Sequence, residues 1–321
     1  MTAPGERKPT FLRDLRLPVL AAPMFLVSGP DMVVAAAEAG IVGAFPTVNA
    51  RTPTDLERWL HDITARLEAA RARAGGRLAG TWAANLIAHR TNPRFAQDLE
   101  LLLKYRPPIV ITALGSPRDV VESVHGYGGL VVADVNSVTF ARKAADAGVD
   151  GLILVASGAG GHTGQMSPFA FVETVREFWD GLLVLAGGIC TGRGVRAAVA
   201  LGADLACMGT RFIATRESLA AAAHKEMVVE CGFEDIVCTN AFTGAWANML
   251  RPSILNAGYD PGNLGPGRRI DVSDDPQSEA RAWKDIYSAG HGVGAVHAIQ
   301  SMHDVVEELR EQYQRAAREA G

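Results

Sequence analysis

Eight short apolar runs recur along the chain, and a segment with helical periodicity separates each run from the next. The runs are rich in Val, Ile, Leu and Ala and show no polar–apolar alternation, which is typical of strands buried on both faces. Strands that alternate with helices in this way form parallel sheets. We therefore expect strands at about 17–24, 41–45, 81–87, 108–112, 129–134, 151–155, 182–186 and 205–208.

Residues that start and stop helices fill the intervals between these runs. Pro30 precedes a helical segment that Gly40 ends, and Thr52 with Asp55 forms a capping box at the start of a longer helix. Further helices are expected at 94–105, 117–124, 137–148, 168–179 and 192–202.

Repeated strand–helix units in a chain of 321 residues predict an α/β fold in which a (β/α)8 TIM barrel closes on itself. An open, doubly wound sheet is the alternative, but that fold usually carries its phosphate-binding glycines after the first strand. Here Gly187-Gly188 and Gly209 follow the seventh and eighth predicted strands. The closed barrel is therefore the favoured fold.

The pattern changes after the eighth strand and indicates a smaller added domain. We expect residues 15–214 to form the barrel, 215–300 an insertion over its mouth, and 301–321 a C-terminal helix that returns to the barrel. Within the insertion we expect a helix at 217–229, a short β or loop element at 239–244, and a mobile lid at 256–275, which is rich in Gly, Pro and charge.

The loop after the sixth strand is the most informative stretch for function. Four glycines between residues 158 and 164 surround one titratable side chain, His162. Glycine lets the backbone adopt positive φ and approach a flat ligand closely. Because barrel enzymes place their chemistry at the C-terminal ends of the strands, His162 is a candidate general base. A tight turn with a surface histidine is the alternative interpretation of this stretch by itself.

Two further glycine turns follow the seventh and eighth strands. In a barrel these two loops, with the start of a short helix, commonly bind a phosphate through backbone amides. Gly187, Gly188, Gly209 and Thr210 are therefore candidates for a phosphate site. Ordinary strand-to-helix turns also contain glycine, and they are the alternative. A second glycine and histidine cluster at 288–294 makes His291 a weaker candidate for contact with substrate.

Charge and composition exclude several classes of protein. The formal net charge of −4 argues against nucleic acid as a partner. We expect no membrane partner, because no apolar run reaches the length of a bilayer and the N-terminus has no signal-like core, so the expected location is cytoplasmic. The four cysteines lack CxxC spacing, which favours free thiols over disulfides, and no metal site is expected.

The ordered set of motifs resembles the flavin-dependent nitronate monooxygenases, formerly called 2-nitropropane dioxygenases, over residues 15–315. The resemblance implies a (β/α)8 barrel with a smaller added domain and non-covalently bound FMN. It implies that Met24 lies against the flavin ring, that Asn85 meets the polar edge of the ring, and that His162 is the catalytic base. The motifs that carry the resemblance are Ala22–Met24, Asn85, Ala159–Gly164, Ala186–Ile189 with Gly192–Gly194, Gly202–Asp204 and Met208–Phe212. The cofactor-binding residues that it implies are Ala22, Pro23, Met24, Asn85, Asp134, Gly160, Gly161, Gly164, Gly187, Gly188, Gly209 and Thr210.

Three positions depart from the pattern of the family. Gly158 stands where many members carry an acidic residue, and Asp134 stands where many have a lysine. His291 follows Ala289-Gly290 where the family pattern has glutamine. The first and third departures bear on substrate preference, and the second on a polar contact with the flavin.

The resemblance implies oxidation of nitronates or nitroalkanes with molecular oxygen to a carbonyl product and nitrite. A neutral imidazole suits the removal of the acidic α-proton of a nitroalkane, while the cofactor performs the redox chemistry. The alternatives are an FMN-dependent NAD(P)H oxidoreductase of the enoyl-acyl-carrier-protein or quinone reductase type, and a flavin-free phosphate-binding barrel. The expected partners are the small-molecule substrate and O2, and formation of a homo-oligomer is left open.

Overall fold

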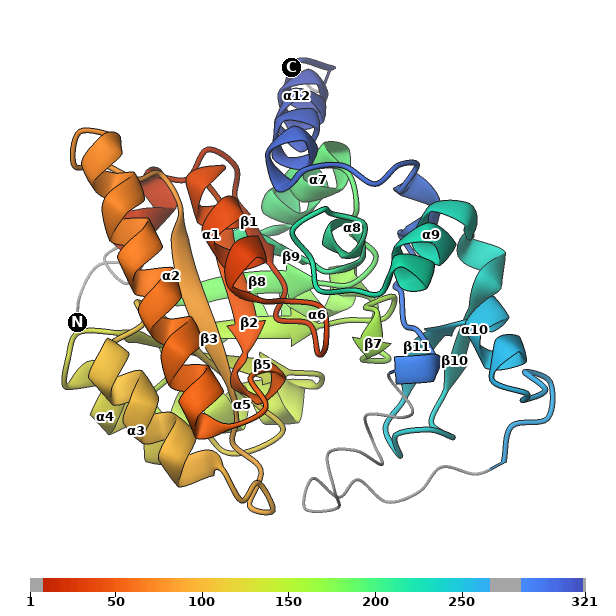
Figure 1. Ribbon diagram of the computed structural model, residues 1–321, viewed down its shortest axis with the longest axis horizontal. Coiled ribbons are helices and arrows are strands. Elements are labelled where there is room, and N and C mark those ends of the chain that lie inside the picture. The colour runs from red at the N-terminus through yellow and green to blue at the C-terminus, as the bar shows by residue number, and fades with distance from the viewer. Residues whose placement is uncertain (1–7, 266–283, 320–321) are drawn as a thin grey trace.

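Eight parallel strands close into a barrel in a computed structural model that describes residues 8–265 and 284–319 (Figure 1). The predicted α/β fold and closed barrel are thereby confirmed. Around the barrel, each strand pairs in parallel with the next, and the last strand pairs with the first. The barrel strands are β1 (Val19–Ala21), β2 (Val42–Pro46), β3 (Thr81–Ile87), β4 (Ile109–Ala113), β5 (Leu130–Val135), β6 (Gly151–Val155), β8 (Leu182–Ala186) and β9 (Leu205–Met208).

Helices surround the barrel and begin where side chains or proline satisfy their first turns. Thr52, Ser137 and Thr191 each accept a hydrogen bond from the amide three residues ahead, and thereby cap α2, α5 and α7. The outer helices are α1 (Pro30–Glu38), α2 (Pro53–Arg73), α3 (Phe95–Tyr105), α4 (Arg118–His125), α5 (Val138–Asp146), α6 (Pro168–Arg176) and α7 (Gly192–Leu201). A short helix, α8 (Thr210–Ile213), follows β9.

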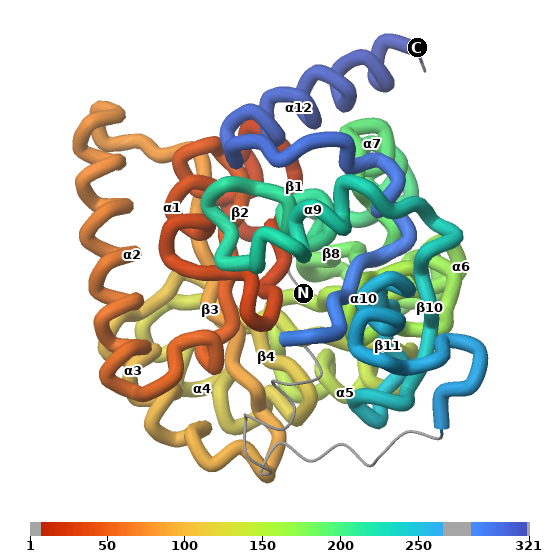
Figure 2. The backbone as a smooth tube through the Cα atoms, turned by 45° about the vertical axis from the view of Figure 1, so that its right-hand side comes forward, coloured from red at the N-terminus to blue at the C-terminus, as the bar shows by residue number. Residues whose placement is uncertain are grey.

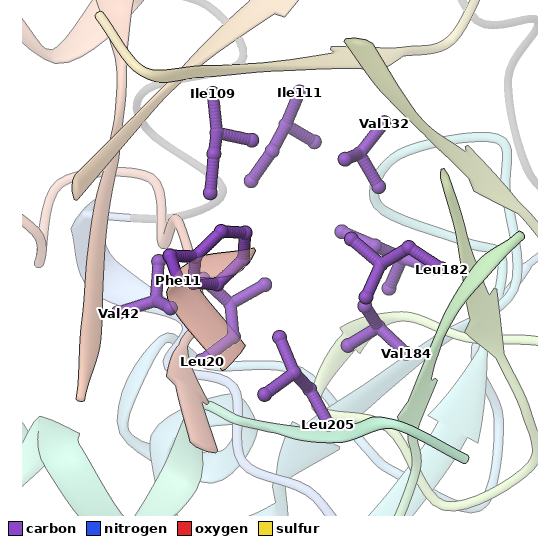
Figure 3. Close-up of a pocket in the computed structure, with 10 residues that line it drawn as sticks. Phe11, Leu20, Val42, Ile109, Ile111, Val132, Leu182, Val184 and Leu205 are labelled. Carbon is purple, nitrogen blue, oxygen red and sulfur yellow. The ribbon is translucent and has the colours of Figure 1, made fainter. Parts of the chain in front are cut away.

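The barrel interior is a packed core and not a channel. The 3-10 helix η1 (Thr10–Arg13) brings Phe11 to the N-terminal end of the barrel, beside Leu20 and Val42 (Figure 3). The remaining cavity holds about 10 Å³ and is lined by apolar side chains, so it offers water no hydrogen-bond partner. A ligand on the barrel axis would therefore bind at the opposite, C-terminal end.

Residues after α8 build the added domain beside the barrel mouth (Figures 1 and 2). A three-stranded antiparallel sheet has the order β10-β11-β7, and β7 is the short strand that contains His162. The other described elements of this region are α9 (Ala222–Glu230), η3 (Phe233–Asp235), β10 (Ile236–Thr239), β11 (Ala247–Leu250), α10 (Arg251–Asn256) and η4 (Val293–Ala295), and β7 spans Gly161–His162.

One prediction in the added domain is corrected, and one strand there was not expected. The helix expected at 217–229 begins only at Ala222, because Lys225 Nζ donates to the carbonyls of Thr215 and Ser218 and thereby fixes the preceding segment as a turn. The element expected at 239–244 is the end of β10 followed by a turn, and the partner strand β11 was not expected.

Part of the predicted lid is described. Residues 256–265 follow α10, and Tyr259 packs edge-on against Phe242 with 5.3 Å between ring centroids. The remainder of the lid, residues 266–275, lies outside the described residues. No described helix is long and apolar enough to span a bilayer.

The C-terminal helix α12 (Met302–Glu319) packs along α7 and also contacts α1 (Figure 1). Its apolar face contains Met302, Val305, Val306 and Leu309, all fully buried. Arg211, itself buried, extends from α8 and pairs with Glu308 of α12 at 2.7 Å. The end of the chain is thereby attached to the loop that follows the last barrel strand.

Candidate functional site

Side chains that point into the barrel form layers of four from alternate strands, as is usual for this fold. The strand registers place Ala22, Asn85, Asp134 and Ala186 in one layer near the mouth. The layer beneath them contains Ala44, Ile111, Ile153 and Cys207, all buried. Three residues expected from the sequence to contact the cofactor therefore share one layer.

The mouth layer combines two small side chains with two polar ones. The alanines add little bulk above the apolar interior, and Ala22 and Asp134 are partly exposed. Asn85 is buried, and its Nδ2 donates to the carbonyl of Ile111 at 3.3 Å. Asp134 faces the barrel interior from β5, next to Ile153 of β6. Burial there raises the pKa of its carboxyl to about 7.

The loop after β1 lies beside this layer and is held rigidly. Asn49 Nδ2 donates to the carbonyls of Met24 and Ser28 at 2.9 and 2.7 Å, while its Oδ1 accepts from the amide of Leu26. Leu26 has a positive φ of 60°, a conformation that needs such support. The loop sets the position of Met24, and Asn49 is a positioning residue that sequence reasoning missed.

His162 is placed by the added domain as well as by the barrel. Its loop returns to the end of β6, since a Cβ on Gly164 would lie 2.0 Å from the carbonyl oxygen of Val155. His162 then pairs with Ala247 of β11. Burial lowers the pKa of the imidazole, which keeps the ring neutral near pH 7.

Asn248 fixes the other side of this loop and was also missed. It is 1% exposed, and its Nδ2 donates to the carbonyl of Ala159 at 2.7 Å. Gly161 has a φ of 67°, which explains the need for glycine in this turn. The signal available in the sequence was a single amide side chain inside the apolar run 247–250.

The two predicted phosphate turns come together above β8 and β9. Gly187 and Gly188 have φ of 137° and 69°, and a Cβ on Gly209 would lie 3.1 Å from Met24 Sδ. The amide of Gly188 donates to the carbonyl of Gly158 at 3.0 Å, and the hydroxyl of Thr210 accepts from the amide of Gly290 at 2.8 Å. The first bond joins the Gly187-Gly188 turn to the loop after β6, and the second joins the start of α8 to the segment 289–292.

His291 lies beside this pair of turns and not within the sheet that holds His162. Its amide also donates to the carbonyl of Gly158, and its exposed ring packs edge-on against Phe233 with 5.0 Å between centroids. The adjoining Gly292 packs against Cys190, because a Cβ there would lie 2.5 Å from the sulfur. The segment 289–292 therefore covers the outer side of the glycine turns.

The four cysteines are free thiols. Burial raises the pKa of Cys190 to about 12, and the pKa of Cys207 is raised further by burial and by the nearby Asp134 charge. Both thiols stay protonated at neutral pH. Neither is therefore suited to act as a nucleophile.

Comparison with solved structures gives the class of protein. The nitroalkane oxidase of Streptomyces ansochromogenes has a TM-score of 0.81 and 25% sequence identity, with 97% of this chain and 100% of that chain covered. A TIM barrel with this likeness and a neutral imidazole at its mouth is an oxidoreductase. The chain belongs to the nitronate monooxygenase family, whose model matches residues 10–312. Members of this family are flavin-dependent enzymes.

Individual relatives carry two kinds of name. The nitronate monooxygenase of Neurospora crassa is 26% identical, with 92% of this chain and 88% of that protein covered. The (3aS,4S,5R,7aS)-5-hydroxy-7a-methyl-1-oxo-octahydro-1H-indene-4-carboxyl-CoA dehydrogenase of Rhodococcus jostii is 27% identical, with 79% of this chain and 68% of that protein covered. The family thus includes relatives named for different oxidative reactions.

Proposed function

We propose that this protein binds FMN at the barrel mouth and oxidises nitronates or nitroalkanes with molecular oxygen, giving a carbonyl product and nitrite. The observation that carries the proposal is a histidine, neutral because of burial, at the C-terminal end of β6 beside a mouth layer with two alanines. Family membership supports a flavin as the cofactor.

The arrangement of the loops favours a mononucleotide over a dinucleotide. The ring would rest on the layer of Ala22, Asn85, Asp134 and Ala186, beside Met24. The phosphate would bind at the turns of Gly187-Gly188 and Gly209-Thr210, close to the start of α8. Segment 289–292 packs directly against Gly158, Gly160 and Cys190. It thereby closes the outer side, where a second nucleotide would have to extend.

The chain's own residues supply a base and exclude water. A nitroalkane at the mouth would lose its α-proton to a ring nitrogen of His162, which can accept it because the imidazole is neutral. The bound flavin would supply the acceptor for the substrate's electrons. We further propose that residues 215–265 and 284–300 cover the substrate, and that His291 lines this cover.

The test is paired kinetics on a nitroalkane and on its pre-formed nitronate, with nitrite and flavin content measured. His162→Ala should slow the nitroalkane reaction about 10²–10⁴-fold and the nitronate reaction much less, since the nitronate has already lost its proton. His303→Ala, at an exposed position on α12, is the matched control and should leave both rates unchanged. Equal losses on both substrates would contradict the role of His162 as base.

An FMN-dependent NAD(P)H oxidoreductase is the second candidate, since relatives include an enzyme named as a dehydrogenase. Anaerobic mixing with NADH or NADPH separates the two activities. Rapid bleaching of the flavin absorbance by either nucleotide, together with an absence of nitrite from nitronates, would favour the reductase. A colourless protein that does not take up FMN would favour a flavin-free barrel.

A further inference from the structure

The barrel interior contains one carboxyl group, at Asp134. Asp134 belongs to the mouth layer, and a second layer lies beneath it. The remaining side chains of these two layers, all from the described part of the barrel, are alanine, isoleucine, cysteine and the neutral amide of Asn85. In the described parts of the chain, the Asp134 carboxyl has no hydrogen bond or ion pair with another residue. It therefore lacks the partners that normally compensate a buried charge.

The groups around Asp134 do not supply a positive charge. β6 and β4 flank β5 with aliphatic side chains, Ile153 and Ile111. From β9, Cys207 faces Asp134, and burial and the charge of Asp134 raise the pKa of the thiol, so it stays neutral. From β3, Asn85 is neutral and already bonded to a carbonyl. Burial is accordingly the cause of the raised pKa, about 7, and a neutral acid is populated at physiological pH.

A neutral carboxylic acid has a property that an ionised one lacks, because it can donate a hydrogen bond. Asp134 shares the mouth layer with two alanines and is partly exposed, so a ligand at the mouth can reach its carboxyl. An ionised carboxylate at the same place would repel electron-rich acceptor atoms and would itself lose hydration when a ligand covered it. Ligand binding and protonation of Asp134 should therefore favour each other.

We propose that Asp134 holds a proton and donates it in a hydrogen bond to an acceptor atom of the flavin ring seated on the mouth layer, so that flavin binding weakens as Asp134 ionises. This inference rests on the proposed function, since it takes FMN as the ligand. The hydrogen bond from Asp134 to the flavin would depend on pH. A permanently charged side chain at the same position would give a contact that does not change over this pH range.

The experiment measures the dissociation constant of FMN for the full-length apoprotein between pH 5.5 and 8.5 by flavin fluorescence. The phosphate of FMN ionises near pH 6 and contributes its own pH dependence. Asp134→Asn shares that contribution but cannot ionise, so the ratio of the two profiles isolates Asp134. Asp146→Asn, at an exposed carboxyl at the end of α5, is the matched control.

The wild-type dissociation constant should rise relative to that of Asp134→Asn by about tenfold per pH unit once the carboxyl is mostly ionised. Asp146→Asn should follow the wild type. Parallel profiles for the wild type and Asp134→Asn would overturn this inference alone. Failure of the wild-type protein to bind FMN at any pH would overturn the proposed function with it.

A second measurement detects the proton itself and does not use a dissociation constant. Infrared difference spectra of the FMN-bound protein between pH 6 and 8.5 report protonated carboxyl groups directly. A protonated carboxyl band should be present at pH 6 in the wild type and missing in Asp134→Asn, with circular dichroism showing that both are folded. Identical spectra for the two proteins would overturn the inference.

Discussion

The ring of His291 lies where a side chain at residue 158 would begin. A Cβ on Gly158 would be 3.1 Å from His291 Nδ1, and Gly158 has a φ of +89°. The backbone carbonyl of Gly158 also accepts from the amide of His291. Gly158 and His291, two of the three departures from the family pattern, are therefore in direct contact. The glycine at 158 leaves room for the imidazole at 291.

The first prediction concerns this contact. Gly158→Ala should destabilise the protein by about 1–2 kcal/mol, because an L-residue is strained at positive φ and its Cβ would approach His291. In a His291→Ala background the strain persists but the contact is gone, so the loss should shrink by about 0.5 kcal/mol or more. Thermal or denaturant unfolding of the four proteins gives this coupling. Strictly additive effects would show that the two residues do not interact.

The second prediction concerns the pH dependence of proton removal. Because burial lowers the pKa of His162, the imidazole stays neutral as the pH falls below the ordinary value of 6.5. The midpoint of the decrease in kcat/KM of a neutral nitroalkane should therefore lie below pH 6.5. Initial rates of nitrite release measure the profile. A decrease centred at or above pH 6.5 would contradict a buried imidazole base.

The third prediction concerns Gly209. A side chain there would meet Met24 Sδ at 3.1 Å and the Cβ of Ala22 at 3.6 Å, and it would fill the space between the phosphate turn and the mouth layer. Gly209→Leu should purify with little FMN, as measured from the ratio of flavin to protein absorbance. Gly232→Ala is the control, because a Cβ at Gly232 has open space. Full flavin content in Gly209→Leu would place the phosphate elsewhere.

The fourth prediction contrasts the two members of a partly buried ion pair. The Arg211 side chain is 2% exposed, whereas that of Glu308 is 41% exposed. Glu308→Ala leaves a buried guanidinium with only Gln300 as a side-chain partner, and should cost on the order of 3 kcal/mol. Arg211→Met leaves a carboxylate that water can reach, and should cost about 1 kcal/mol. Chemical denaturation of both variants tests the order, and the reverse order would contradict this explanation.

The fifth prediction concerns His224, which is 6% exposed and stacks on Tyr287 at 4.5 Å. Burial lowers the pKa of its imidazole to about 4. Since the folded pKa lies below the unfolded value, its neutral form stabilises the fold above pH 6.5, and this contribution is lost as the pH falls toward 4. The loss at pH 4 should reach about 3 kcal/mol and should be missing in His224→Gln. Melting temperatures from pH 7 to 4 provide the measurement, with His303→Gln as the exposed control.

Much of the barrel could be predicted from the sequence, because each strand is a contiguous apolar run and each helix has its own local start and stop residues. Thr52 with Asp55 and the glycine after α7 are examples of such local signals. The barrel layers also follow from the period of two within each strand, once the registers are known.

The contacts that complete the site could not be predicted in this way, because they join residues far apart in the chain. β7 is two residues long and pairs with Asn248 and Ala247, and neither partner carries a local strand signal strong enough to identify it. The same holds for the bond from Gly290 to Thr210. The sequence predicts which residues form the site, but it does not indicate that Asn49 and Asn248 hold the adjoining loops in place.

The pairing of β7 with β11 has a consequence for how such enzymes can diversify. His162, the base of the proposed mechanism, lies between two barrel strands in the sequence. In the structure it is part of β7, which belongs to the sheet of the added domain. Replacement of the added domain by recombination would therefore change the proposed substrate cover and the orientation of the base in a single event. The turns after β8 and β9, which bind the flavin in the proposed function, would be inherited intact. Substrate range and proton chemistry should consequently evolve together in this lineage, and cofactor choice should evolve separately from both.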